Sequence, residues 1–191
     1  MIRLVYSFED FINESKKQKF KKGCVMVYAD FPDDITEIHD AIEEDDIFTK
    51  EGDRTFGLDK ESHVTLLYGL DKTVTKDQVK EVIKDLDFGK LNVHNLSIFD
   101  NPEYDVLKFD VDAKSLNKGN KLLTDALPYE NDFPDYHAHM TVAYLKKGKG
   151  KKYVKMFKDK EFKIEPTKIV YSQPSGKKST ILTLKKNVKD K

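Results

Sequence analysis

Several features are scarce in this 191-residue chain, and each scarcity excludes a class of protein. The single cysteine, Cys24, has no partner for a disulfide, which is typical of a reducing cytosol. No apolar run approaches the ~20 residues that a membrane-spanning helix needs. Arg3, Glu9 and Asp10 interrupt the N-terminus too early for a signal peptide. Lys plus Arg and Asp plus Glu both number 34, so overall charge does not indicate a polyanion binder. We therefore expect a cytoplasmic protein without a membrane segment.

Charged residues are abundant but unevenly placed. They make up 36% of the chain against 38% apolar residues, and the apolar ones recur with clear periods, which predicts a well-solvated globular protein. Residues 30–53 are acidic and residues 146–160 are strongly basic. Such runs are usually solvated faces. The basic run directly follows a histidine motif, however, so a role in attracting phosphate stays open.

The periodicity predicts one main domain at residues 23–184, in which strands and helices interleave. Strands are expected at residues 24–28, 63–68, 91–99, 106–111, 138–145, 168–172 and 180–184. Helices are expected at residues 32–44, 75–86, 115–127 and 151–157, with Thr75 and Ser115 as caps and a capping box at Thr75-x-x-Gln78. Residues 1–22 predict an appended amphipathic helix with a linker, and residues 185–191 a Lys-rich tail.

Two of the predicted strands carry matching sequences. SHVTLLY at residues 62–68 and AHMTVAY at residues 138–144 agree in position and kind, 76 residues apart (139 minus 63). This is what an internally duplicated fold produces. Since residues i and i+2 of a strand share a face, His63 and Thr65 point together, as do His139 and Thr141. Strict alternation also predicts that Tyr68 and Tyr144 lie on the opposite, packed face.

Two imidazoles and two hydroxyls in one cleft suit the cleavage of a phosphodiester without a metal. One neutral imidazole takes the proton from the attacking hydroxyl, and one imidazolium protonates the leaving oxygen. Histidine suits both tasks because its unperturbed pKa lies near 6.5. The hydroxyls of Thr65 and Thr141 can bind the non-bridging oxygens as charge builds on them. We expect no metal and no cofactor.

A three-histidine zinc site is the alternative. His137 and His139 have a metal-ligand spacing, and His63 could complete the set. That interpretation leaves the second threonine and the duplication unexplained, so we expect His137 to support the site or to lie at the strand entrance. His39, on the predicted acidic helix, and His94, at the start of a strand, have no partner motif and are interpreted as half-buried structural residues.

These residues resemble the two-histidine (2H) phosphoesterase superfamily, which includes LigT-like enzymes and carries two His-x-Thr/Ser motifs on central strands. Within it, the segments GCVMVY at 23–28, DDIF at 45–48, GL at 57–58, HVTLLYG at 63–69 and YHAHMT at 136–141 are similar to phage anti-CBASS phosphodiesterases. The resemblance implies an α+β fold of two duplicated lobes, with antiparallel sheets forming a central cleft.

The resemblance also implies a substrate and a mechanism. Enzymes of this kind cleave the 3′–5′ bonds of cyclic di- and trinucleotide messengers such as cGAMP, in the bacterial host cytoplasm if the gene is phage-encoded. The ribose 2′-OH attacks the adjacent phosphate, with His63 and His139 as acid and base and Thr65 and Thr141 as phosphate holders. Base stacking there relies partly on tryptophan, which this chain lacks. Phe99 and Tyr171 are the candidates for substrate binding, with a role as core aromatics as the alternative.

Two other functions remain open from the sequence. The first is an RNA-end enzyme acting on 2′,3′-cyclic phosphates or 2′–5′ linkages, as other 2H proteins do, with RNA ends as partners. The second is a non-catalytic sponge that binds a cyclic nucleotide without cleaving it. The two intact His-x-Thr pairs favour an enzyme, because binding alone needs no matched acid and base. The sequence does not indicate an oligomeric state.

Overall fold

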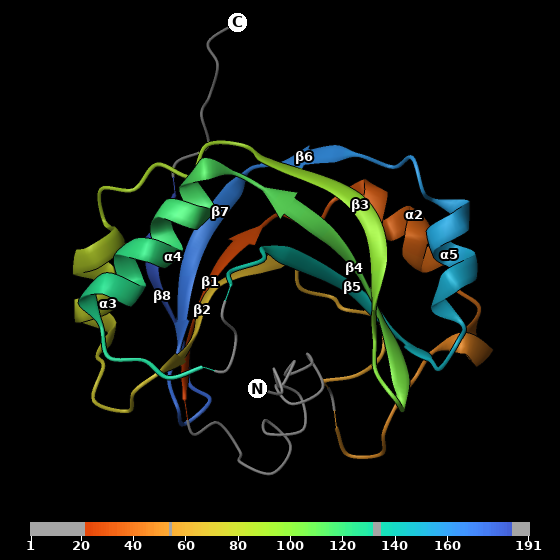
Figure 1. The fold of residues 1–191 in the computed structure, drawn as a ribbon, viewed down its shortest axis with the longest axis horizontal. Coiled ribbons are helices and arrows are strands. Elements are labelled where there is room, and N and C mark those ends of the chain that lie inside the picture. The colour runs from red at the N-terminus through yellow and green to blue at the C-terminus, as the bar shows by residue number, and fades with distance from the viewer. Residues whose placement is uncertain (1–21, 54, 132–134, 185–191) are drawn as a thin grey trace, which may run out of the picture.

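The computed structural model describes residues 22–53, 55–131 and 135–184, which form two four-stranded antiparallel sheets. The sheet of lobe A has the strand order β2 (His63–Leu70), β1 (Gly23–Ala29), β7 (Pro166–Ser172), β8 (Lys178–Thr183). The sheet of lobe B has the order β5 (His139–Lys146), β4 (Tyr104–Asp112), β3 (Leu91–Asp100), β6 (Phe162–Ile164). Together the sheets form an arch (Figure 1). The predicted fold class, α+β with two lobes of antiparallel sheet, is confirmed.

In the part of the chain that the structure describes, the helices lie on the outer side of the arch. Helices α3 (Lys76–Ile83) and α4 (Lys114–Ala126) lie against lobe A, and α2 (Asp33–Ala41) and α5 (Gly150–Met156) lie against lobe B (Figure 1). A short 3-10 helix, η1 (Glu44–Asp46), follows α2. The face of each sheet that turns away from the helices is called the inner face below. The apolar residues between helices and sheets form a core that runs through both lobes.

The order of the elements shows the duplication. The series β1-α2-β2-α3 repeats as β4-α4-β5-α5, with one motif strand in each half. In each half the first helix crosses to the other lobe, so that α2 contacts β5 and α4 contacts β2. Because the halves exchange a helix, neither lobe can be separated from the other without exposing core surface. The motif strands β2 and β5 are edge strands of their sheets and contact each other.

Several local features follow from the sequence as expected, and others do not. Thr75 caps α3 through the predicted capping box, with both reciprocal bonds to Gln78 present. The predicted cap at Ser115 is wrong, because Ala113 is the N-cap of α4 and the Ser115 hydroxyl donates to the Phe88 carbonyl oxygen at 2.8 Å. Strand β6 was not predicted. Its three residues are too few to show an alternating pattern.

The predicted terminal segments fall largely outside the described residues. The amphipathic helix with its linker was predicted at residues 1–22 and the Lys-rich tail at residues 185–191, and of these only residue 22 is described, so the proposed domain boundaries stay predictions. In the described part of the chain, none of the helices combines the length and apolarity that a membrane crossing requires.

Candidate active site

Each motif strand carries a β-bulge at the same place. In lobe A, Met26 pairs with Thr65 and Val25 with Leu67, which leaves Leu66 as the extra residue. In lobe B the neighbouring pairs shift in the same way, and Val142 is the extra residue. The two strands consequently share one burial pattern from histidine to tyrosine, with half-buried positions at His, Thr and Tyr.

The bulges change the face on which the two tyrosines lie. Tyr68 pairs with Cys24 and His63 pairs with Tyr28, and these partners are separated by an even number of positions on β1. Tyr68 therefore shares the inner face with His63 and Thr65, and by the equivalent register Tyr144 shares it with His139. The prediction that these tyrosines lie on the opposite face is wrong, since the sequence gives no sign of a bulge that interrupts the alternation.

Both imidazoles are oriented by the same backbone contact. Nδ1 of His63 lies 3.2 Å from the carbonyl oxygen of Glu61, and Nδ1 of His139 lies 3.0 Å from that of His137. A carbonyl oxygen can only accept, so Nδ1 carries the proton and donates it in each case. Nε2 is then the nitrogen left to exchange a proton with a substrate, in either histidine.

The two motifs meet at their first residues. The hydroxyl of Ser62, directly before His63, donates to the sulfur of Met140, directly after His139, at 3.2 Å. The backbone N–H of Asp59 donates to the carbonyl oxygen of Val142 at 2.9 Å. The two histidines are close enough that the charge of His63 is one cause of a lowered pKa at His139. The pair therefore lies together at the junction of the two lobes.

His63 lies among hydrogen-bonded polar groups. The ring of Tyr28 stacks on the imidazole, with centroids 5.3 Å apart. The Tyr28 hydroxyl donates to Glu61 at 3.0 Å and accepts from the Lys178 ammonium at 3.1 Å, and Lys178 also pairs with Glu61 at 2.7 Å. Asp59 is close by, and burial raises the pKa of its carboxyl, opposed by the positive charge of His63. Two carboxylates, those of Glu61 and Asp59, thus lie near His63.

His139 lies in a drier setting. Burial lowers its pKa below the ordinary value, and the nearby Lys108 ammonium lowers it further, against the opposing bond from His139 to the His137 carbonyl. The edge of the Phe99 ring meets the imidazole, with centroids 5.0 Å apart. Lys108 lies 4.8 Å from the centroid of Phe99 and forms an ion pair with Asp110. His139 is therefore biased toward the neutral form that a base requires.

The segment between η1 and β2 closes the outer edge of β5. The backbone N–H of Phe48 donates to the carbonyl oxygen of Tyr144 at 3.0 Å, and the N–H of Tyr144 donates to the carbonyl oxygen of Gly57 at 2.8 Å. His39, on α2, lies with Nε2 2.8 Å from the Val142 carbonyl oxygen, so it is the half-buried structural residue that was predicted. These contacts fix the backbone around the bulge of β5.

Phe99 and Tyr171, the two predicted base-stacking residues, lie in different places. Phe99 is half-buried on the inner face beside His139, and its role toward a substrate stays a prediction. Tyr171 is fully buried, and its hydroxyl donates to the Val74 carbonyl oxygen at 2.9 Å. The predicted stacking role of Tyr171 is therefore wrong, because its position opposite Val25 points its side chain to the core rather than the inner face. Tyr28 is the inner-face aromatic that sequence reasoning missed.

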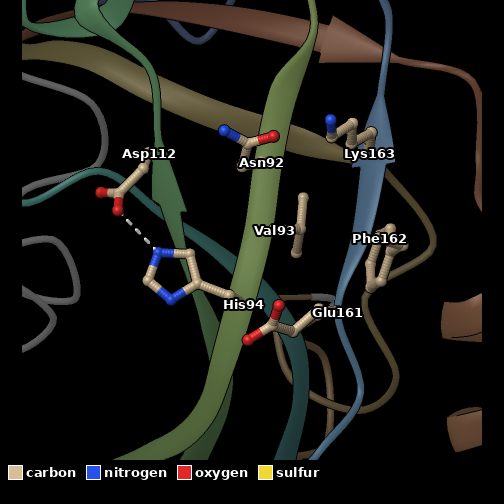
Figure 2. Close-up of a pocket in the computed structure, with 7 residues that line it drawn as sticks. All are labelled: Asn92, Val93, His94, Asp112, Glu161, Phe162 and Lys163. Atoms are coloured by element: carbon tan, nitrogen blue, oxygen red, sulfur yellow. Dashed lines mark hydrogen bonds and ion pairs between the residues drawn. The ribbon is translucent and has the colours of Figure 1, made fainter.

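His94 and His137 stand apart from the motif pair. His94 bonds through Nε2 to Asp112 at 2.8 Å and lines a hollow of about 510 Å³ beside β3 (Figure 2). The hollow is lined by Asn92, Val93, His94, Asp112, Glu161, Phe162 and Lys163. His137 precedes β5, its side chain is exposed, and its carbonyl oxygen orients His139. Among residues 22–53, 55–131 and 135–184, no three His, Cys, Asp or Glu side chains gather in a way that could hold a metal ion.

Comparison with known proteins identifies relatives by fold only. No family model and no curated protein matches the sequence. Among solved structures, Usb1 of Kluyveromyces marxianus matches with a TM-score of 0.56 and 11% identity, covering 86% of this chain and 98% of Usb1. A structure of the same protein with uridine monophosphate matches with a TM-score of 0.55 and 11% identity, over 86% and 99% of the two chains. At this identity the likeness shows a shared fold.

Proposed function

We propose that this chain is a metal-independent phosphodiesterase in which His63 and His139 act as acid and base. The observation that supports this best is the repetition of one arrangement in both halves. Each motif strand has the same bulge, the same contact from Nδ1 to the carbonyl two residues earlier, and a threonine on the histidine's face. A structural role does not require two oriented Nε2 atoms to lie together, whereas acid-base cleavage does.

The proposed reaction needs only these groups. One Nε2 accepts the proton of a ribose 2′-OH, whose oxygen attacks the adjacent phosphorus. The P–O5′ bond breaks, and the other histidine, which is protonated, gives its Nε2 proton to the leaving O5′. The products are a 2′,3′-cyclic phosphate and a 5′-hydroxyl, and water opens the ring with the two histidines in reversed roles. Thr65 and Thr141 donate hydrogen bonds to the non-bridging oxygens, which carry most of the charge in the transition state.

For the substrate, we propose cyclic di- and trinucleotides, with escape from CBASS defence as the biological role. The support is the motif resemblance noted from the sequence. Inner-face aromatics beside both histidines, Tyr28 and Phe99, offer surfaces on which bases could lie. An RNA end is the second candidate, and the supporting observation is the fold shared with Usb1, of which one structure contains uridine monophosphate.

The test is incubation with a panel of cyclic di- and trinucleotides and an RNA ending in a 2′,3′-cyclic phosphate, in EDTA, read by chromatography. Cleavage of the cyclic compounds supports the first candidate. Cleavage of the RNA alone, with binding that weakens as salt rises, supports the second. His63→Ala and His139→Ala should each lower the rate about 10²- to 10⁴-fold. Thr36→Ala is the control, since Thr36 is exposed on α2, on the outer side of the arch.

Three results would contradict the proposal. Full turnover by either His→Ala variant would remove the acid-base pair from the mechanism. Ligand recovered unchanged after long incubation, despite tight binding, would indicate a sponge. Activity that appears only when zinc is supplied would indicate that the histidines bind a metal.

A further inference from the structure

The duplication makes the strand positions of the two halves directly comparable, and the halves differ at the position opposite the motif threonine. Met26 on β1 stands opposite Thr65, and Lys108 on β4 stands opposite Thr141. The strand registers of the two halves agree, because the next inner-face residue stands opposite the motif histidine in each half, Tyr28 opposite His63 and Asp110 opposite His139. One threonine therefore faces a thioether across the strand pair, and the other faces a lysine.

Lys108 is buried in an unusual place. Its relative exposure is 8%, although it lies on the inner face rather than toward the helices. A buried ammonium loses free energy of hydration, and a partner charge offsets only part of that loss. The partner is Asp110, which also accepts from the amide of Asn95 and stands opposite His139. A methionine, as in the other half, would fill this position without any such cost.

Two contacts of the ammonium, together with the strand position of Lys108, indicate where its charge lies. It pairs with Asp110, whose strand position faces His139. It lies 4.8 Å from the centroid of Phe99, whose edge meets the His139 ring. Its strand position faces Thr141, and cross-strand neighbours have Cβ atoms only about 5 Å apart. The charge of Lys108 is thus held beside both members of the second motif.

We propose that Lys108 is a further residue of the reaction site, where its ammonium binds a non-bridging oxygen of the phosphate beside Thr141 and makes His139 the base and His63 the acid. This inference rests on the proposed phosphodiesterase function. The lysine supplies in lobe B the positive charge that a pentacoordinate phosphate needs, and Asp110 holds it in position before the substrate arrives. A cation beside His139 also disfavours a second positive charge there in the free enzyme, so His139 is the neutral histidine that can accept the hydroxyl's proton, and His63 carries the proton that goes to the leaving oxygen.

The charges around His139 agree with this assignment. Lys108 and Asp110 face it from β4, and His63 faces it from β2, while the uncharged Phe99 faces it from β3. Burial is the largest cause of the lowered pKa of His139, and Lys108 and His63 act in the same direction. The His137 carbonyl and Asp110 oppose them. Removing Lys108 should therefore raise the pKa of His139, and removing the charge of Asp110 should lower it.

The decisive experiment uses Lys108→Met, which copies the side chain that the other half carries at the equivalent position and should therefore fit. Lys108→Arg keeps the charge, and Asp110→Asn removes only the counter-charge. For each variant and the wild type, kcat and KM are measured on whichever panel compound is cleaved, over pH 5 to 9. In parallel, the imidazole titrations of the five histidines are followed by NMR without substrate.

We expect Lys108→Met to lower kcat about 10²-fold with a smaller change in KM, comparable to the loss of one transition-state donor. In Lys108→Met the midpoint of the His139 titration should move to higher pH, and in Asp110→Asn the same midpoint should move to lower pH. Lys108→Arg should recover a large part of kcat. The fall in kcat, with its recovery in Lys108→Arg, separates a phosphate-binding lysine from a purely structural one, because any charge beside His139 would move its titration.

Two outcomes separate the inference from its premise. If the wild type cleaves a panel compound and Lys108→Met keeps kcat within about twofold, Lys108 does not bind the phosphate, whether or not the His139 titration moves. If the wild type cleaves nothing in the panel, the proposed function is wrong, and the inference about Lys108, which rests on that function, is wrong as well, whatever the titrations show.

Discussion

The ring of Tyr28 stacks on the imidazole of His63, with centroids 5.3 Å apart and the two planes 24° from parallel. Burial raises the pKa of Tyr28 to about 12, so the phenol stays neutral. Its hydroxyl can then both donate to Glu61 and accept from Lys178 near neutral pH. His63 is held on one side by this ring and at Nδ1 by a backbone carbonyl, which leaves its Nε2 in a single direction.

Tyr28→Ala should consequently loosen His63 without removing it. An aromatic pair contributes about 0.5–1.5 kcal/mol beyond its buried area, so kcat should fall about twofold to tenfold. Tyr28→Phe is the matched control, because it keeps the stacked ring and removes only the hydroxyl. Steady-state kinetics on a compound that the wild type cleaves measures both. Equal losses in the two variants would show that the bonds to Glu61 and Lys178, rather than the stack, position His63.

Gly69 and Gly57 provide a matched pair for testing the backbone around the motif strands. Both have positive φ, +100° at Gly69 and +102° at Gly57. A Cβ at Gly69 would lie 2.2 Å from the Glu130 carbonyl oxygen, whereas a Cβ at Gly57 meets nothing within 4 Å. Gly57→Ala therefore carries only the strain of its φ, about 1–3 kcal/mol.

Gly69→Ala should lose clearly more stability than Gly57→Ala, by at least about 2 kcal/mol, because backbone atoms must move to admit the methyl group. Urea unfolding of the two variants and the wild type measures the difference. Similar losses would mean that residue 130 shifts freely. In that case the bond from its N–H to the Gly69 carbonyl oxygen contributes little to the end of β2.

Asp46 joins η1 to α5 from a position that is 1% exposed. Its carboxylate accepts from Lys152 at 2.5 Å, from the Tyr153 hydroxyl at 2.7 Å and from Lys149 at 3.1 Å. The bond from Lys152 is the largest of the causes that lower the pKa of Asp46 well below its usual range. A carboxylate with a lowered folded-state pKa stabilises the protein above its unfolded value near 3.9 and loses that contribution as pH falls further.

Asp46→Asn should reduce the free energy of unfolding at pH 7 by about 1–3 kcal/mol, toward the lower end because both lysine heads are partly solvated. The loss should shrink below about pH 4, where the Asp46 carboxylate of the unfolded wild-type chain begins to protonate while that of the folded chain stays charged. Urea titrations at pH 7 and pH 3 measure this. Asp45→Asn, at the exposed neighbouring position, removes the same charge and should have little effect at either pH. A loss at Asp46 that does not depend on pH would contradict the electrostatic explanation.

The motif pair could be predicted from the sequence because it depends on local alternation. The side chains at His63 and Thr65 are two residues apart, and no bulge lies between them, so the period of two places them correctly. The same holds for Thr75, whose cap involves only the next three residues. Such features need no knowledge of which strands become neighbours.

Features that depend on strand pairing could not be predicted. The faces of Tyr68 and Tyr144 follow from bulges, which are visible only when the partner strand is known. Tyr171 was a candidate for substrate binding, but the face on which it lies follows from its pairing with Val25. Lys108 alternates with apolar neighbours, which is typical of a strand with one solvated face. It is instead buried on that face, beside Phe99 and Asp110.

The lowered pKa of His139 gives a last prediction, on pH. If His139 is the base, kcat/KM falls on the acid side as His139 of the free enzyme becomes protonated, so the midpoint of this limb should lie below the ordinary histidine value near 6.5. Phe99→Ala should admit water to the imidazole and move the midpoint up toward 6.5, because burial is the main cause of the shift. Phe31→Ala is the control, since that ring is 39% exposed and contacts His39 instead. Rates between pH 4.5 and 9 provide the measurement. A wild-type acid limb centred above 6.5 would assign the base to a group other than His139.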